Sequence, residues 1–236
     1  MRLDKYLSGS GMFSRSEAGR AIRSGRITVN GEVVKSPSVH IDENTASVKY
    51  GDEAVVWTKY KYAMLNKPEG YISATDTDPS DTGRTVMSLL PPEFTRLGMF
   101  PCGRLDIDTV GLLLITDNGP LAHELLSPKH HVEKTYRFRC SVPVGDEMHE
   151  RLESGIEFSD FTSKPCRVVL DPDGLSGEIS VTEGKFHQVK RMFHAVGSEI
   201  VFLERIRFGP LELDNSLPRG EWRWLTEAEI AALNSL

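Results

Sequence analysis

Beyond residue 60 the chain alternates short apolar segments, typical of β-strands, with amphipathic segments, typical of helices, in no regular order. Regular strand–helix–strand repeats would predict a parallel sheet with helices on both faces. Their absence and the short connections favour an α+β domain with a mixed, mostly antiparallel sheet flanked by helices. We expect strands at 61–65, 111–115, 135–142, 166–170, 178–182, 201–208 and 221–225, and helices at 85–90, 120–126, 146–154, 187–196 and 227–233.

The first fifty residues predict a separate small unit. Ser14 and Glu17 have the spacing of a capping box, in which the two side chains satisfy backbone N–H groups at a helix start. Two arcs are expected on this helix, one apolar and one basic: Ala18, Ala21 and Ile22 against Arg15, Arg20 and Arg23. Asn30-Gly31, between two short β-branched runs, predicts a hairpin turn because both positions tolerate positive φ. Residues 51–59 are expected to form a linker and the entry strand to a second domain.

This N-terminal segment is basic although the chain is acidic. The net charge of the whole chain is −6, whereas residues 1–35 carry seven Lys or Arg and three Asp or Glu, a net charge of +4. A polyanion responds to such a local field rather than to the sum of all charges. Solvated helix charges are the ordinary alternative, but the accompanying helix and hairpin favour an RNA partner.

Several classes of protein are disfavoured by the remaining composition. The cysteines Cys102, Cys140 and Cys166 are odd in number and form no CxxC pair, so neither a disulfide framework nor a zinc site is indicated. There is no export signal, no apolar run of membrane length, and no GxxxxGKS or GxGxxG motif. We expect a cytoplasmic monomer with no metal, no nucleotide cofactor and no membrane partner.

A polar loop at 103–110 runs directly into the apolar segment 111–115 and carries Arg104, Asp106 and Asp108. A carboxylate held beside a cation at a strand edge stays ionised and can act as a nucleophile. From these residues alone, a salt bridge that merely caps the strand is the stronger interpretation.

Three other segments carry polar side chains next to apolar ones in the sequence. Tyr136 starts a strand on the same face as Lys134 and Phe138, a position that is usually part of the core. Lys67 lies in an Asn-Lys-Pro turn. The helix expected after Gly184 has a packed face, and its opposite arc is cationic: His187, Lys190, Arg191 and His194.

These motifs resemble two known families. The S4 RNA-binding module is similar to the LDKYL opening, the SRSEAGRAIRSGRITVNGEVV stretch and a trailing strand at 46–50. The RsuA/RluB/E/F family of rRNA pseudouridine synthases, and most closely its RsuA branch, is similar to the strings LNKPEG, GRLDIDTVGLLLITDNG, EKTY and KFHQVKRMF, in this order. The resemblance covers essentially the whole chain and implies an S4-like RNA-binding domain at 1–58 followed by a catalytic domain at 59–236.

The resemblance also implies roles for single residues. Asp106 is the expected catalytic aspartate, and Asp108 is a neighbour without the central role. Tyr136 is expected to stack on the flipped uracil and to shuttle a proton. Lys190 would pair with Asp106 and keep it ionised, with Arg191 as the nearer alternative. Contacts with RNA are expected from Arg15, Arg20, Arg23, Arg26, Lys67, Arg104, Lys185, His187, Gln188 and Arg191.

The implied reaction detaches a uracil from its ribose at N1, turns it and rejoins it through C5, which needs no cofactor. Asp106 could attack the sugar carbon, abstract a sugar proton or add to the base, and the sequence leaves these routes open. The expected substrate is a uridine of 16S rRNA, free or in a small-subunit assembly intermediate. The alternatives are 23S rRNA or a non-catalytic S4-type RNA-binding assembly factor. A hydrolytic glycosidase is disfavoured because Asp106 and Asp108 would point in alternate directions in an extended loop.

Overall fold

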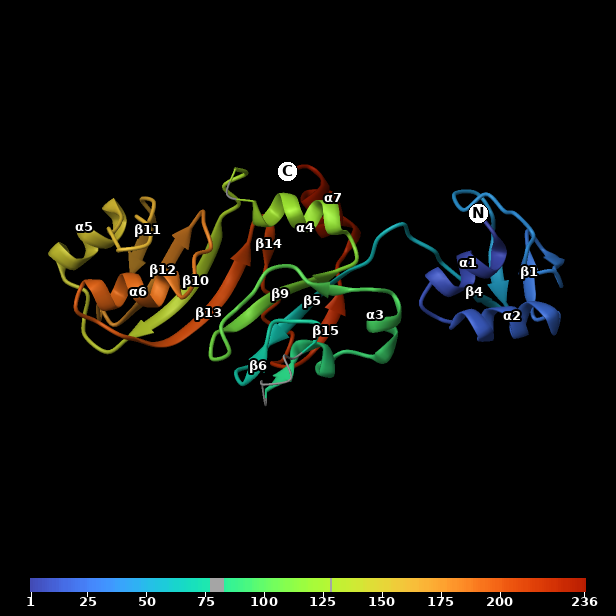
Figure 1. The fold of residues 1–236 in the computed structure, drawn as a ribbon, viewed down its shortest axis with the longest axis horizontal. Coiled ribbons are helices and arrows are strands. Elements are labelled where there is room, and N and C mark those ends of the chain that lie inside the picture. The colour runs from blue at the N-terminus through green and yellow to red at the C-terminus, as the bar shows by residue number, and fades with distance from the viewer. Residues whose placement is uncertain (77–82, 128) are drawn as a thin grey trace. The chain divides into compact units, whose positions relative to one another are not determined.

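The computed structural model describes residues 1–76, 83–127 and 129–236. The acidic stretch 76–85, to which the sequence assigns no role, lies largely outside them. The chain divides into two compact units, Met1–Lys61 with Pro91–Met99, and Tyr62–Leu90 with Phe100–Leu236 (Figure 1). Over the described ranges, no helix is long and apolar enough to cross a bilayer, and no group of three or more His, Cys, Asp or Glu side chains is placed to hold a metal ion.

The N-terminal unit packs two helices against a small antiparallel sheet of order β2-β1-β3-β4. Its elements are α1 (Leu3–Gly9), α2 (Arg15–Arg23), β1 (Ile27–Val29), β2 (Glu32–Val33), β3 (Val48–Tyr50) and β4 (Glu53–Ala54), and α3 (Pro92–Arg96) is assigned to the same unit. The capping box of α2 is confirmed, because Glu17 N–H donates to Ser14 Oγ at 3.3 Å and Ser14 N–H donates to Glu17 Oε2 at 2.7 Å. The two arcs of α2 are confirmed as well, since the apolar arc is buried and the three arginines are exposed.

One expectation about the end of this unit is wrong. Residues 51–59 read as a linker and an entry strand to the second unit, yet β4 pairs antiparallel with β3 and completes the first sheet. Gly51 makes the tight turn between them with a φ of 60°, a conformation that glycine adopts without steric cost. Two residues of strand carry too little periodicity to be assigned to a partner from sequence.

The second unit is built on a mixed sheet in the order β11-β12-β10-β13-β9-β5-β15, with β14 added to β13 and β8 added to β9. Its strands are β5 (Tyr62–Lys67), β8 (Phe100–Pro101), β9 (Val110–Thr116), β10 (Lys134–Cys140), β11 (Arg167–Leu170), β12 (Ser176–Val181), β13 (Ile200–Phe208), β14 (Leu211–Glu212) and β15 (Trp222–Trp224), with the separate parallel pair β6 (Tyr71–Ile72) and β7 (Arg84–Thr85). Within the main sheet the pairings given are antiparallel except that of β9 with β13. The expected α+β class with a mostly antiparallel sheet is confirmed.

Helices pack against this sheet. They are a 3₁₀ helix (Val86–Leu89), α4 (Gly119–Leu126), α5 (Asp146–Ser154), α6 (Gln188–Ala195) and α7 (Glu227–Asn234). One core cluster joins α5 and α6 to strands β10–β13, with Leu152, Met192 and Phe193 packed against Phe138 and Ile179. Figure 1 shows α5 and α6 beside these strands. This packing leaves the first turn of α6 close to the loop between β8 and β9, where Lys190 contacts Asp106.

Candidate active site

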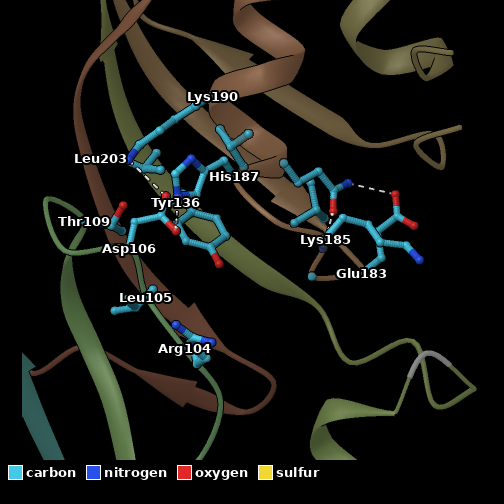
Figure 2. Close-up of a pocket in the computed structure, with 14 residues that line it drawn as sticks. Arg104, Leu105, Asp106, Thr109, Tyr136, Glu183, Lys185, His187, Lys190 and Leu203 are labelled. Carbon is cyan, nitrogen blue, oxygen red and sulfur yellow. Dashed lines mark hydrogen bonds and ion pairs between the residues drawn. The ribbon is translucent and has the colours of Figure 1, made fainter. Parts of the chain in front are cut away.

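One pocket gathers side chains from three distant segments. Asp106 comes from the loop between β8 and β9, Tyr136 from β10, and Lys190 from the first turn of α6, and all three line the same pocket with Leu203 of β13. The Lys190 ammonium lies 2.9 Å from Asp106 Oδ2. Figure 2 shows the Tyr136 ring beside the Asp106 carboxylate. The structure therefore brings together the three residues that the sequence singled out.

Lys190 is shared between two carboxylates. Its ammonium also lies 2.5 Å from Asp108 Oδ1. Burial lowers the pKa of Lys190, but the hydrogen bonds to Asp108 and Asp106 outweigh this and raise the pKa above its ordinary value. Burial raises the pKa of Asp108, and the hydrogen bond from Lys190 overcomes this and lowers it. The cation thus favours the ionised form of Asp108.

Lys67 fixes the loop that carries Asp106. Its side chain is 0% exposed, and its ammonium donates to the carbonyl oxygens of Pro68, Asp106, Ile107 and Thr109 at 3.1, 3.0, 3.3 and 2.8 Å. The expectation that Lys67 meets an RNA phosphate is wrong, because a fully buried ammonium has no surface to present. Burial lowers the pKa of Lys67 to about 8, although the nearby carboxylates partly counter this.

Ser73 is a second support of this loop that sequence analysis missed. Its buried hydroxyl donates to Leu105 O at 3.0 Å and accepts from Leu105 N–H at 3.1 Å, directly before Asp106. The backbone adds a bond from Gly70 N–H to Ile107 O at 2.7 Å. The NKP turn marked the approach of Lys67, but a lone serine after a short strand gives no comparable signal.

The turn before α6 is held by a buried amide. Gln188 donates from Nε2 to Glu183 Oε1 at 2.7 Å and accepts from Lys185 N–H at 3.1 Å. Its side chain is buried, but Gln188 also lines the pocket, so its expected contact with RNA stays a prediction. Arg191 pairs with Asp160 at 2.5 Å and stacks near Phe158, so the alternative that it pairs with Asp106 is wrong.

The other predicted RNA contacts of this unit lie at the rim. Arg104, Lys185 and His187 are exposed and line the groove that adjoins the pocket. His187 Nε2 is 3.6 Å from Asp106 Oδ1, so it closes one side of the catalytic loop. In the N-terminal unit, Arg15, Arg20, Arg23 and Arg26 are all exposed. These exposed side chains can contact phosphates, whereas the buried side chain of Lys67 cannot.

The arrangement supplies an ionised carboxylate, a cation that stabilises it and an aromatic face. A carboxylate so held can attack carbon or accept a proton. The aromatic face suits a planar base. A cationic rim suits a polyanionic substrate.

Comparison with known proteins agrees with this geometry. The family model described as RNA pseudouridylate synthase matches residues 61–195, and the S4 domain model matches residues 1–46. The RNA pseudouridine synthase YtzG of Bacillus subtilis is 41% identical over 99% of this chain and 98% of its own length. Ribosomal small subunit pseudouridine synthase A of Salmonella typhimurium is 40% identical over 99% of this chain and 100% of its own.

A solved structure extends the similarity to the fold. A crystal structure of a pseudouridylate synthase superposes with a TM-score of 0.67, at 37% identity and over 99% of both chains. The matches cover both units and the segments that carry Asp106, Tyr136 and Lys190. This chain belongs to the RsuA/RluB/E/F family of RNA pseudouridine synthases, a family of isomerases, and carries an S4 domain at its N-terminus.

Proposed function

We propose that this chain converts one uridine of 16S rRNA to pseudouridine, in free RNA or in a small-subunit assembly intermediate. The observation that carries the proposal is the Lys190–Asp106 ion pair at 2.9 Å in the pocket that Tyr136 also lines. The choice of small-subunit RNA is supported by the similarity, over nearly the whole chain, to a relative named ribosomal small subunit pseudouridine synthase A.

In this proposal Asp106 is the catalytic carboxylate. The reaction breaks the N1–C1′ bond and forms a C5–C1′ bond, and the proton of C5 is replaced by one on N1, so the atoms balance without a cofactor. Attack on the sugar carbon, removal of a sugar proton and addition to the base all begin from an ionised carboxylate. Lys190 stabilises that form, and Tyr136 offers a stacking face to the uracil and a hydroxyl for proton transfer.

The side chains at the rim of the pocket assist the extrusion of the target uridine in this proposal. A stacked uridine must be extruded into the pocket at a cost of a few kcal/mol. Arg104 lines both the pocket and the adjoining groove, where its guanidinium can fill the vacated space or hold a phosphate. Lys185 extends the same cationic rim, and His187 lies beside it.

We propose that residues 1–58 act as the RNA-binding domain and residues 59–236 as the catalytic domain. The exposed arginines Arg15, Arg20 and Arg23 lie along α2, and Arg26 follows at the start of the hairpin. Arg26 also donates to the Tyr50 hydroxyl at 2.5 Å, which orders its guanidinium. Phosphate contacts of this kind fix register and orientation rather than sequence.

The test is release of tritium from RNA labelled at uridine C5. Full-length 16S and 23S transcripts, and small-subunit assembly intermediates, are assayed separately with the wild type and with Asp106→Asn, and the modified position is mapped. Asp146→Asn serves as the matched control, because Asp146 is an exposed carboxylate on α5 away from the pocket.

We expect release from 16S RNA at one position, lost in Asp106→Asn and retained in Asp146→Asn. Release from 23S RNA alone would keep the chemistry and overturn the 16S assignment. Undiminished release by Asp106→Asn would remove Asp106 from the catalytic role.

A further inference from the structure

An exposed aromatic ring stands at the rim of the active site. The side chain of Phe186 is 76% exposed, more than any other large apolar side chain in the part of the chain that the structure describes. A phenylalanine in contact with water loses the free energy that burial would provide. Phe186 therefore calls for an explanation, and its position directly after Lys185 and before His187 suggests one.

Phe186 does not stand alone. Its ring lies parallel to the His187 imidazole, with ring centroids 3.8 Å apart and an interplanar angle of 16°. His187 holds the left-handed conformation, with a φ of 49°. His187 Nε2 is 3.6 Å from Asp106 Oδ1, so a stacked pair of rings extends from the catalytic carboxylate outward to solvent.

The groove around these rings is suited to nucleic acid. Phe186 and His187 line it together with the exposed Arg104 and Ile107 and with Ile72 of β6. Lys185, also exposed, adds a second cation to the same lining. Flat rings interleaved with cations are the features that bind bases and phosphates of a single strand. An apolar protein segment would leave Arg104 and Lys185 without partners.

We propose that Phe186 and His187 form a stacking platform for the nucleobase next to the target uridine. When the uridine enters the pocket, its neighbour loses a stacking partner, and the outer face of Phe186 replaces that partner. This inference rests on the catalytic role proposed for the Asp106 pocket.

The platform is sequence-tolerant, since every base has a flat face. Its loss should therefore weaken the binding of RNA without changing which uridine is modified. Substitutions of Phe186 separate stacking from apolar contact: Phe186→Tyr keeps an aromatic ring, Phe186→Leu keeps the apolar contact without the ring, and Phe186→Ala removes both. Val169→Ala is the control, because Val169 is an exposed apolar residue on β11 outside the groove.

The first readout is tritium release from whichever rRNA transcript is active. We expect Phe186→Ala and Phe186→Leu to raise KM roughly tenfold with a smaller effect on kcat, in line with the stacking energy of one base. Phe186→Tyr and Val169→Ala should remain within about twofold of the wild type. Equal activity of Phe186→Leu and wild type would overturn the platform, because an apolar contact would then suffice.

The second readout reports stacking directly. A short RNA that contains the mapped uridine carries 2-aminopurine in turn at its 5′ and 3′ neighbours, and binding by the full chain is followed by fluorescence. We expect quenching at one neighbour with wild type and with Phe186→Tyr, and loss of that quenching with Phe186→Leu. Quenching that is the same in Phe186→Leu would refute the proposal.

The two readouts test the catalytic assignment and the stacking platform independently of each other. If Asp106→Asn stays active, the catalytic assignment fails while the fluorescence result still decides the platform. If tritium release depends on Asp106 but neither neighbour is quenched on binding, the platform fails and the catalytic assignment stands.

Discussion

The Lys190 ammonium contacts two carboxylates in this pocket, and the two differ in solvent exposure. Lys190 contacts Asp106 and Asp108 at 2.9 and 2.5 Å, but the Asp108 side chain is 65% exposed whereas that of Asp106 is 26% exposed. The more exposed carboxylate is better solvated and is a weaker candidate to react with a base held in the pocket. Asp108 instead adds a second anchor that aims Lys190 at the loop.

Replacing Lys190 should therefore change the pH profile as well as the rate. In Lys190→Gln, Asp106 loses the ammonium 2.9 Å from its carboxylate and Asp108 loses the hydrogen bond that lowers its pKa, so the acid limb of kcat/KM should move to higher pH. The profile is measured by tritium release between pH 4.5 and 8. Lys190→Arg, which keeps the charge, should leave the limb near its wild-type position.

Arg207→Gln provides the matched control, because Arg207 is a cation of the same unit whose ion pair with Glu212 is exposed. An acid limb that stays in place in Lys190→Gln would show that Lys190 does not set the ionisation of the pocket.

At the residue scale, the sequence predicted which side chains meet in the pocket better than it predicted the contacts that support them. Asp106, Tyr136 and Lys190 lie in distinctive strings, and the structure places them in one pocket. Lys67 and Gln188 lie in equally distinctive strings but are buried. A motif shows that a side chain is needed, whereas only the three-dimensional packing shows whether it faces the substrate or the backbone.

Among the elements, β9 sets the position of the catalytic loop. It runs parallel to β13, with Gly111 opposite Arg205, and the chains approach so closely that a Cβ on Gly111 would lie 2.4 Å from Arg205 O. Gly111 also has a φ of 98°, which L side chains rarely adopt. Both facts require glycine five residues after Asp106.

We expect Gly111→Ala to destabilise the catalytic unit by about 2 to 5 kcal/mol, through backbone strain and the separation of β9 from β13. Urea unfolding gives the change in stability, and tritium release at low temperature gives the activity of the folded fraction. Gly119→Ala at the start of α4 is the control, since a Cβ there meets nothing within 4 Å. Equal stability of the two variants would contradict this account.

The longer elements could be predicted because a longer segment shows more repeats of its hydrophobic pattern. The expected helix 146–154 coincides with α5, and the expected strand 201–208 falls within β13. The elements missed were β6, β7, β8 and β14, each of two residues, and the short α3. The two-residue strands form because another strand offers backbone groups to pair with, and a five-residue helix is too short to show a periodic pattern.

For the molecule as a whole, buried cations link stability to pH. Lys134 is buried beside Arg205 and donates to Val132 O at 2.8 Å. Burial, followed by repulsion from Arg205, lowers the pKa of Lys134 to about 8. Burial acts in the opposite sense on the thiols, and raises the pKa of Cys102 to about 11 and of Cys166 to about 12. The total pH dependence is therefore a difference between opposing contributions.

Comparing the wild type with Lys134→Met isolates the contribution of Lys134 to the pH dependence of stability. Because the pKa of Lys134 is about 8 in the folded protein against 10.5 ordinarily, the unfolded chain binds more protons between these values. The charged form costs stability below pH 8, and this cost disappears as pH rises. The unfolding free energy of the wild type minus that of the variant should thus increase from pH 8 to 10, by up to about 1.4 kcal/mol per pH unit.

The measurement needs a signal from the catalytic unit alone. Trp57 lies in the N-terminal unit and Trp222 and Trp224 in the catalytic unit, so fluorescence in a Trp57→Phe background reports urea unfolding of the catalytic unit. Lys129→Met, at an exposed position of the same unit, should run parallel to the wild type across this range. If Lys134→Met also runs parallel, Lys134 keeps the same proton affinity in the folded and unfolded chain, and its burial beside Arg205 would carry no electrostatic cost.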